Sequence, residues 1–252
     1  MSSILDQAQP VSEVSNSVNV LLYGDSGVGK TVFAGSGREL GKNDLIIDVE
    51  GGTISAARSN SKANAIHVKN YDEFLSVISA IEDEPDRFEW VVVDSLTRLQ
   101  DLIWEKIVGE AVDRNPSRSP YKRELQEYGE AQARLKEVVE RLNGSDANIL
   151  WTALADTEVD EDGNNTRIPA IHGGQGKISA WVSAQMDIVA FLRIVRKDDK
   201  VARAFYFGKT PEFYAKDRVQ VFKKAQLGLT LGAFTNKILG AAEEENTAKK
   251  EK

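Results

Sequence analysis

The chain has 252 residues, a formal net charge of −7 and no cysteine. This length suits one large domain with a full hydrophobic core. The lack of cysteine excludes a disulfide framework and a thiolate metal site, and two histidines are too few for a histidine-rich one. The negative charge argues against a protein that coats polyanions indiscriminately.

Charge is unevenly spread along the chain. Residues 177–224 hold eleven Lys and Arg against five Asp and Glu, whereas residues 71–110 hold three against eleven. The carboxyl-terminal third is therefore the candidate surface for a polyanion. No apolar run reaches membrane-spanning length and the amino terminus lacks a signal-peptide pattern, so we expect a soluble, cytoplasmic protein with no membrane partner.

Composition divides the chain into three regions. Residues 1–17 are rich in Ser, Gln and Asn and show little periodicity, which predicts a disordered lead-in. Residues 18–240 alternate apolar runs with helical patterns and predict one α/β domain. Residues 241–252 are charged and low in apolar residues, which predicts a disordered tail.

A glycine-rich segment lies between the first predicted strand, residues 18–23, and a predicted helix that ends near Gly41. Its spacing, G-x-x-x-x-G-K-T, is that of a P-loop, whose backbone NH groups and helix amino terminus converge on phosphate oxygens. Lys30 would reach the outer phosphates, and Thr31 would hold Mg2+ through its hydroxyl. A glycine-rich turn without a ligand is the weaker alternative, because strand, motif and helix are in register. The predicted nucleotide-binding residues here are Gly24, Asp25, Ser26, Gly27, Val28, Gly29, Lys30 and Thr31.

Acidic residues end two further predicted strands. Residues 45–50 form an apolar strand with Glu50 at its tip, and ligands of open parallel sheets lie beyond such tips. Residues 90–95 are the Walker B arrangement, four apolar residues and then an acid. Asp94 would bind Mg2+ through water, and Ser95 could support it.

The middle of the chain carries three more candidate residues. Residues 109–120 contain two prolines together with Arg114 and Arg118, which predicts an exposed basic loop. Thr152, near the tip of a strand at residues 148–154, is placed to sense the γ-phosphate or the attacking water, or is simply a β-branched strand residue. The other predicted elements are a strand at residues 65–69, helices at 74–81, 96–107, 125–142 and 178–185, a hairpin turn at 162–163, and a hairpin of residues 187–195 and 201–207.

ATP is the predicted nucleotide. A GTPase would show Asp-x-x-Gly at the second motif, yet Asp94 is followed by Ser-Leu-Thr. It would also show Asn-Lys-x-Asp for guanine, yet the only Asn-Lys pair, at residues 236–237, runs into Ile-Leu.

Taken together, these motifs resemble the RecA-like ATPases and, within them, the phage nucleotide-binding proteins that act as single-strand annealing proteins or recombinases of the Sak type. The resemblance implies a RecA-like P-loop core with a mostly parallel central sheet flanked by helices and a carboxyl-terminal β-hairpin extension. It also implies the host cytoplasm as location if the chain is phage-encoded. It spans roughly residues 18–225 and rests on the order and spacing of residues 24–31, 47–52, 91–95, 173–189 and 215–218.

The resemblance also implies roles for individual residues. Glu50 is similar to the RecA-type catalytic glutamate that polarises the attacking water. Lys216 and Arg218 are similar to the lysine and arginine fingers that enter a neighbour's ATP site. The alternative for these two cations is pairing within the chain, with Glu212 or Asp217, or a solvated strand edge.

Two regions, residues 109–120 and 155–177, correspond to the DNA-binding loops of this family. We predict that Arg114, Arg118 and Lys177 contact DNA phosphates, because they lie in glycine- or proline-broken segments. The alternative is a surface charge that only aids solubility.

The leading hypothesis is an ATPase, with ATP and Mg2+ as cofactors, that binds single-stranded DNA and promotes annealing or strand pairing. A replicative helicase loader or helicase-core ATPase would share every motif. A third alternative is a non-hydrolysing assembly module in which nucleotide only joins subunits. The expected partners are single-stranded DNA, further copies of the chain in a ring or filament, and a single-strand DNA-binding protein.

Overall fold

The computed structural model describes residues 17–37, 43–159, 162–173, 178–197 and 200–250. The predicted lead-in lies outside these residues except for Ser17, and so does Lys177. The strands are β1 (Asn19–Gly24), β2 (Asn43–Asp48), β3 (Asn64–His67), β4 (Phe88–Asp94), β5 (Asn148–Val159), β6 (Asn165–Pro169), β7 (Ile188–Lys197), β8 (Lys200–Tyr206), β9 (Lys216–Asp217) and β10 (Ala225–Leu227). The helices are α1 (Lys30–Ala34), α2 (Ile54–Arg58), α3 (Tyr71–Asp83), α4 (Leu96–Arg114), α5 (Leu125–Asn143), α6 (Ile178–Gln185) and α7 (Leu231–Lys250).

One large, mostly parallel sheet forms the centre of the molecule. Its strands run in the order β10-β8-β7-β1-β5-β4-β2-β3, and those from β7 to β3 are all mutually parallel. β8 and β10 extend one edge as antiparallel strands, while β9 pairs with β7 and β6 pairs with β5. The predicted fold class, a RecA-like P-loop core with a carboxyl-terminal hairpin, is confirmed.

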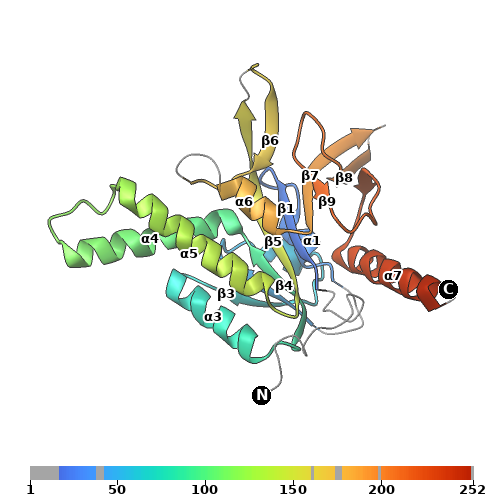
Figure 1. Ribbon diagram of the computed structural model, residues 1–252, viewed down its shortest axis with the longest axis horizontal. Coiled ribbons are helices and arrows are strands. Elements are labelled where there is room, and N and C mark those ends of the chain that lie inside the picture. Colours follow the sequence, from blue (N-terminus) through green and yellow to red (C-terminus); the bar gives the residue numbers. More distant parts are fainter. Residues whose placement is uncertain (1–16, 38–42, 160–161, 174–177, 198–199, 251–252) are drawn as a thin grey trace.

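Helices cover both faces of the sheet, and the strands are apolar on both sides for this reason. Leu21 and Tyr23 of β1 pack in the core that contains α3, α4, α5 and α6. The alternate residues Val20 and Leu22 pack in a second core with α1, α2 and the start of α7. Figure 1 shows α3, α4 and α5 layered over one face, with the far ends of α4 and α5 projecting from the body.

Local sequence sets several helix starts. Asn70 accepts a hydrogen bond from Glu73 N and so begins α3. Ser95 accepts one from Arg98 N and begins α4. A capping box of Glu124 and Glu127 begins α5. Each of these side chains satisfies a backbone NH that the first helical turn leaves free.

Two predicted boundaries are wrong. The P-loop helix ends at Ala34 rather than near Gly41, because Gly35 follows and Ser36 is bound to the start of α7 by hydrogen bonds from Leu231 N and Gly232 N. Helix α4 continues through residues 109–114, which we predicted as loop, because Val108 and Ala111 extend its buried side.

One strand is longer than predicted, and one helix forms where no element was predicted. β5 runs on to Val159 and pairs with β6 from Ala155↔Pro169 to Val159↔Asn165, so the predicted turn at residues 162–163 joins a longer hairpin. Helix α7 continues to Lys250, through residues that we predicted as disordered. Their Ala, Glu and Lys content has high helix propensity, which a measure of apolar content alone overlooks.

Candidate nucleotide-binding site

The P-loop connects β1 to α1 at the carboxyl edge of the sheet. β5 lies between β1 and β4, so Thr152 sits on the strand that separates the P-loop strand from Asp94. Gly24 approaches the backbone of Leu192 so closely that a Cβ would lie 2.3 Å from its carbonyl oxygen. A side chain at position 24 would therefore push the loop away from β7.

Asp94 is the centre of a buried group of oxygens. Thr31 Oγ1 lies 2.5 Å from Asp94 Oδ2, and Thr152 Oγ1 lies 2.5 Å from Asp94 Oδ1. The Asp94 residue is only 1% exposed. Thr152 therefore holds the Walker B carboxylate in place. It can reach Asp94 because β5 lies between β1, which leads into the P-loop, and β4, which ends in Asp94.

These residues fit the predicted Mg2+ site. A hydroxyl and a carboxylate are the hard oxygen ligands that Mg2+ takes, and the ion usually completes its shell with water and phosphate oxygens. The backbone at Gly52 runs close by, since a Cβ there would lie 3.7 Å from Thr31 Oγ1 and 3.9 Å from Asp94 Oδ2. The glycine leaves room beside the Thr31–Asp94 pair.

Lys30 is a buried cation folded against its own loop. Its Nζ donates to the carbonyl oxygens of Gly24 and Asp25, each at 3.0 Å. Burial lowers the pKa of Lys30, while the charges of Asp94, Glu50 and Asp25 oppose that shift. A lysine in the P-loop carries the positive charge that is needed to neutralise the outer phosphates of a bound nucleotide.

Glu50 lies at the same edge, directly after β2. Its Oε1 accepts a hydrogen bond of 2.5 Å from Ser95 Oγ. The backbone NH groups of Val49 and Glu50 both point at Asp94 O, at 2.9 and 3.3 Å. The structure thus brings together Lys30, Thr31, Asp94 and Glu50, which lie up to 64 positions apart in the chain.

Asp48 is a site residue that the sequence analysis did not single out. Its Oδ1 accepts from Gly51 N and Gly52 N at 2.7 and 3.0 Å, and its Oδ2 accepts from Thr53 Oγ1 at 3.1 Å. This buried carboxylate holds the turn that carries Glu50. The Gly51-Gly52 pair marks a tight turn after β2, and an acid at the end of that strand lies within reach of the NH groups of the turn.

Two arginines contact the P-loop and were also missed. Arg167 of β6 forms an ion pair with Asp25, and its Nη1 donates to Thr157 Oγ1 at 3.0 Å. Arg203 of β8 donates from Nε to Val28 O at 3.0 Å. No short motif marks either residue, because both reach the loop from distant strands.

The two predicted finger residues lie away from the P-loop of their own chain. β9 pairs Lys216 with Val189, opposite Leu21 in β1, whereas the P-loop leaves β1 at Gly24. Lys216 Nζ donates to Ser183 O at 2.7 Å, and Arg218 Nη2 donates to Ala184 O at 3.1 Å. Within the chain, both cations therefore bind carbonyl groups near the end of α6.

The predicted DNA-binding residues have different surroundings. Arg114 is exposed at the end of α4, where its Nε donates to Glu110 O at 3.1 Å. Arg118 is not exposed as predicted: its side chain is 11% exposed and donates to both carboxylate oxygens of Glu127, at 2.5 and 2.8 Å. Glu127 is buried at the start of α5, and this explains why it takes a partner.

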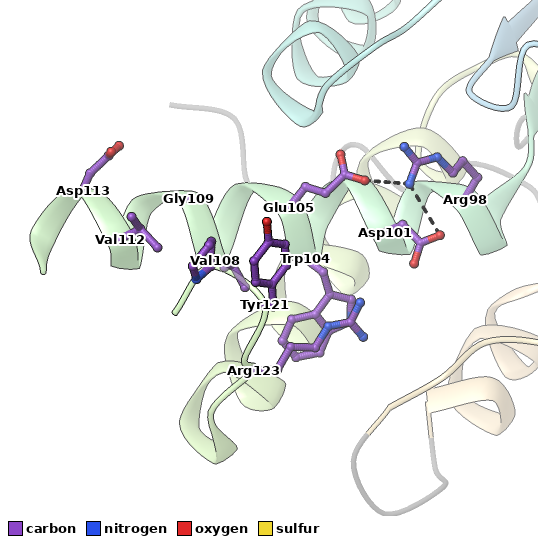
Figure 2. Close-up of a pocket in the computed structure, with 11 residues that line it drawn as sticks. Arg98, Asp101, Trp104, Glu105, Val108, Gly109, Val112, Asp113, Tyr121 and Arg123 are labelled. Carbon is purple, nitrogen blue, oxygen red and sulfur yellow. Dashed lines mark hydrogen bonds and ion pairs between the residues drawn. The ribbon is translucent and has the colours of Figure 1, made fainter. Parts of the chain in front are cut away.

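A cavity of about 500 Å³ lies along α4 beside the segment that joins it to α5 (Figure 2). Arg123 lies over the Trp104 ring at 4.5 Å, and Arg98 pairs with Asp101 and Glu105 on the same helix. None of its lining residues belongs to the P-loop or to the ends of β1, β2 and β4. It is separate from the nucleotide-binding site.

Among the helices of the described residues, none is both long and apolar enough to cross a membrane.

This fold and these residues define a P-loop ATPase, a protein whose activity depends on a nucleotide and usually on Mg2+. The chain belongs to the AAA domain family, whose sequence model matches residues 16–219. A solved structure of a KaiC-like protein from the hyperthermophilic archaeon Pyrococcus horikoshii OT3 is similar at 17% identity and a TM-score of 0.43, over 75% of this chain and 77% of that one. A search of the curated proteins matched none of them.

Proposed function

We propose that this protein hydrolyses ATP with Mg2+ and uses that activity to bind single-stranded DNA and promote the pairing of complementary strands. The observation that carries the ATPase part is the meeting of Lys30, Thr31, Asp94 and Glu50 at one edge of the sheet. Each has the chemistry that phosphoryl transfer to water requires.

The roles follow from the geometry. Lys30 moves its ammonium from the loop carbonyls to the outer phosphates of ATP and neutralises their charge. Glu50, oriented by Ser95, accepts a hydrogen bond from the attacking water and takes its proton. Thr31 and Asp94 hold the metal, and Thr152 keeps Asp94 in place. Bound Mg2+ supplies charge that offsets the negative charge of the phosphates.

Single-stranded DNA as a partner is supported by the excess of cations that residues 177–224 carry. The β5–β6 hairpin projects from the carboxyl edge of the sheet (Figure 1) and is joined to the P-loop by the Arg167–Asp25 ion pair. Its charged residues are mostly acidic, so its charge does not favour contact with a phosphate backbone.

Assembly into a homo-oligomer is supported by Lys216 and Arg218. They lie toward the opposite end of β1 from the P-loop of their own chain. A role at an ATP site therefore requires a second copy, whose P-loop faces these two cations.

The test is the rate of ATP hydrolysis by the full chain with Mg2+, alone and with a single-stranded oligonucleotide or a duplex of the same length. We expect hydrolysis, a several-fold stimulation by the single strand, and annealing of complementary strands. Hydrolysis without stimulation or annealing would remove DNA from the proposal and leave the ATPase. No hydrolysis under any condition would overturn the catalytic part.

A further inference from the structure

Arg203 reaches the P-loop from β8. Alternation along the strand places it on the same face as Phe205, whose ring packs 5.0 Å from that of Phe33 in α1. On this face the Arg203 side chain extends to the loop, and its Nε donates to Val28 O at 3.0 Å. The residue as a whole is nevertheless exposed.

The guanidinium lies directly against Gly29, the residue before the P-loop lysine. A Cβ at Gly29 would be 2.2 Å from Arg203 Nε, 2.8 Å from Cζ and 3.0 Å from Nη2. Gly29 also has a φ of 102°, a left-handed conformation that side chains rarely adopt. Glycine at this position therefore allows both the loop conformation and the close approach of Arg203.

The charge of Arg203 is not offset by a carboxylate among the described residues. By contrast, Arg167 pairs with Asp25 on the same loop, and Arg118 pairs with Glu127. A guanidinium has five N–H donors, and the one hydrogen bond that the described residues show for Arg203 uses only Nε. Its Nη groups remain as donors with the fork geometry that matches phosphate oxygens.

We propose that Arg203 is a phosphate-binding residue of the ATP site, donating from its Nη groups to the phosphates of a nucleoside polyphosphate while its Nε holds the Val28 carbonyl. The inference rests on the proposed binding of ATP and adds a residue that lies outside the P-loop motif. It also makes the β7–β8 hairpin part of the nucleotide-binding site.

The test compares the full-length wild type with Arg203→Ala and Arg203→Lys by titration calorimetry, using ATP and inorganic tripolyphosphate with Mg2+ as separate ligands. Arg193→Ala is the control, because Arg193 lies on the neighbouring strand and stacks over Tyr206 instead. We expect Arg203→Ala to raise the dissociation constants for both ligands about tenfold. Arg203→Lys should lose less, and Arg193→Ala should match the wild type.

A second measurement separates a phosphate contact from a purely structural brace. The wild-type dissociation constant should rise more steeply with KCl concentration than that of Arg203→Ala. Salt screens the contact between Arg203 and the phosphates, and only the wild type makes that contact. Circular dichroism confirms folding, and Arg203→Lys serves if the alanine variant does not fold.

Three outcomes would overturn the inference. The first is unchanged binding of both ligands by Arg203→Ala. The second is a loss of affinity for ATP but not for tripolyphosphate, which would place Arg203 on the base. The third is a loss of affinity in both Arg203→Ala and Arg203→Lys with unchanged salt dependence. A wild type that binds neither ligand would instead overturn the proposed function itself.

Discussion

Ser95 Oγ donates a 2.5 Å hydrogen bond to Glu50 Oε1, linking the end of β4 to the end of β2. The same hydroxyl accepts from Arg98 N at the start of α4, so its position is set by the helix. Glu50 is exposed, yet its Oε1 is held by the hydrogen bond from Ser95 Oγ. A carboxylate held in this way is oriented before the water arrives, which favours its use as a general base.

The first prediction tests Glu50 as the group that activates water. Glu50→Gln should bind ATP nearly as the wild type does, because the side chain faces water rather than phosphate. Turnover should fall by on the order of a hundredfold or more. Binding is measured by calorimetry and turnover by phosphate release, with Glu84→Gln, a change in an exposed surface pair, as control. Wild-type turnover in Glu50→Gln would place the base elsewhere.

A second prediction concerns Lys30. Lys30→Ala should abolish ATP binding or reduce turnover by on the order of a hundredfold or more, because its ammonium neutralises the outer phosphates. Lys69→Ala, which changes an exposed lysine outside the P-loop, should behave as the wild type. Normal hydrolysis by Lys30→Ala would show that residues 24–31 do not form the nucleotide site.

Thr152 provides a test of the metal site. Thr152→Val keeps the shape of the side chain but removes the hydrogen bond to Asp94 Oδ1. The Mg2+ concentration that gives half-maximal ATPase activity should rise by roughly tenfold, since groups that hold a metal ligand tune its affinity. Thr152→Ser retains the hydroxyl and should restore the wild-type requirement. An unchanged Mg2+ requirement in Thr152→Val would make Thr152 a packing residue only.

The pair of Arg118 and Glu127 gives a prediction about stability and pH. Arg118→Ala should lower the midpoint of thermal unfolding at pH 7, because Glu127 stays buried without its partner. Arg118 holds the pKa of Glu127 below its usual range. The stabilisation is therefore complete above the unfolded pKa of about 4.3 and is lost as pH falls through the lower folded pKa.

The difference in unfolding midpoint between wild type and Arg118→Ala should accordingly shrink as the pH is lowered from 7 to below about 4. Arg87→Ala breaks an exposed pair with Glu84 and should change the midpoint little at either pH. A difference for Arg118→Ala that does not depend on pH would assign its effect to packing instead.

The last prediction asks whether Arg218 completes the ATP site of a neighbouring copy. Arg218→Ala should bind ATP nearly normally but hydrolyse it poorly, because the cation stabilises charge on the departing γ-phosphate. Mixing it with Glu50→Gln should restore some activity, since mixed interfaces can pair an intact Glu50 with an intact Arg218. No rescue at any ratio, with both variants folded and assembled, would leave Arg218 as a partner of the Ala184 carbonyl and of Asp187 within its own chain.

The parts of the site that depend on short stretches of chain could be predicted from the order of the residues alone. The P-loop spacing, the acid at the end of β4 and the carboxylate after β2 are each read within about ten residues, because a strand followed by a turn places its last side chains at the sheet edge. The period of apolar residues likewise located α3 and α5.

Which distant side chains meet depends on how the strands and helices pack in the folded chain. Arg203 lies against Gly29 because β8 joins the sheet two strands away from β1, and Arg118 is buried because the start of α5 packs beside it. The same reason applies to α4, which continues past Ile107 since Val108 and Ala111 are buried in the folded chain. The pattern of residues within one segment does not show which other segment its side chains will contact. Those contacts determine how deeply each side chain is buried, which charges lie beside it and which hydrogen bonds it forms.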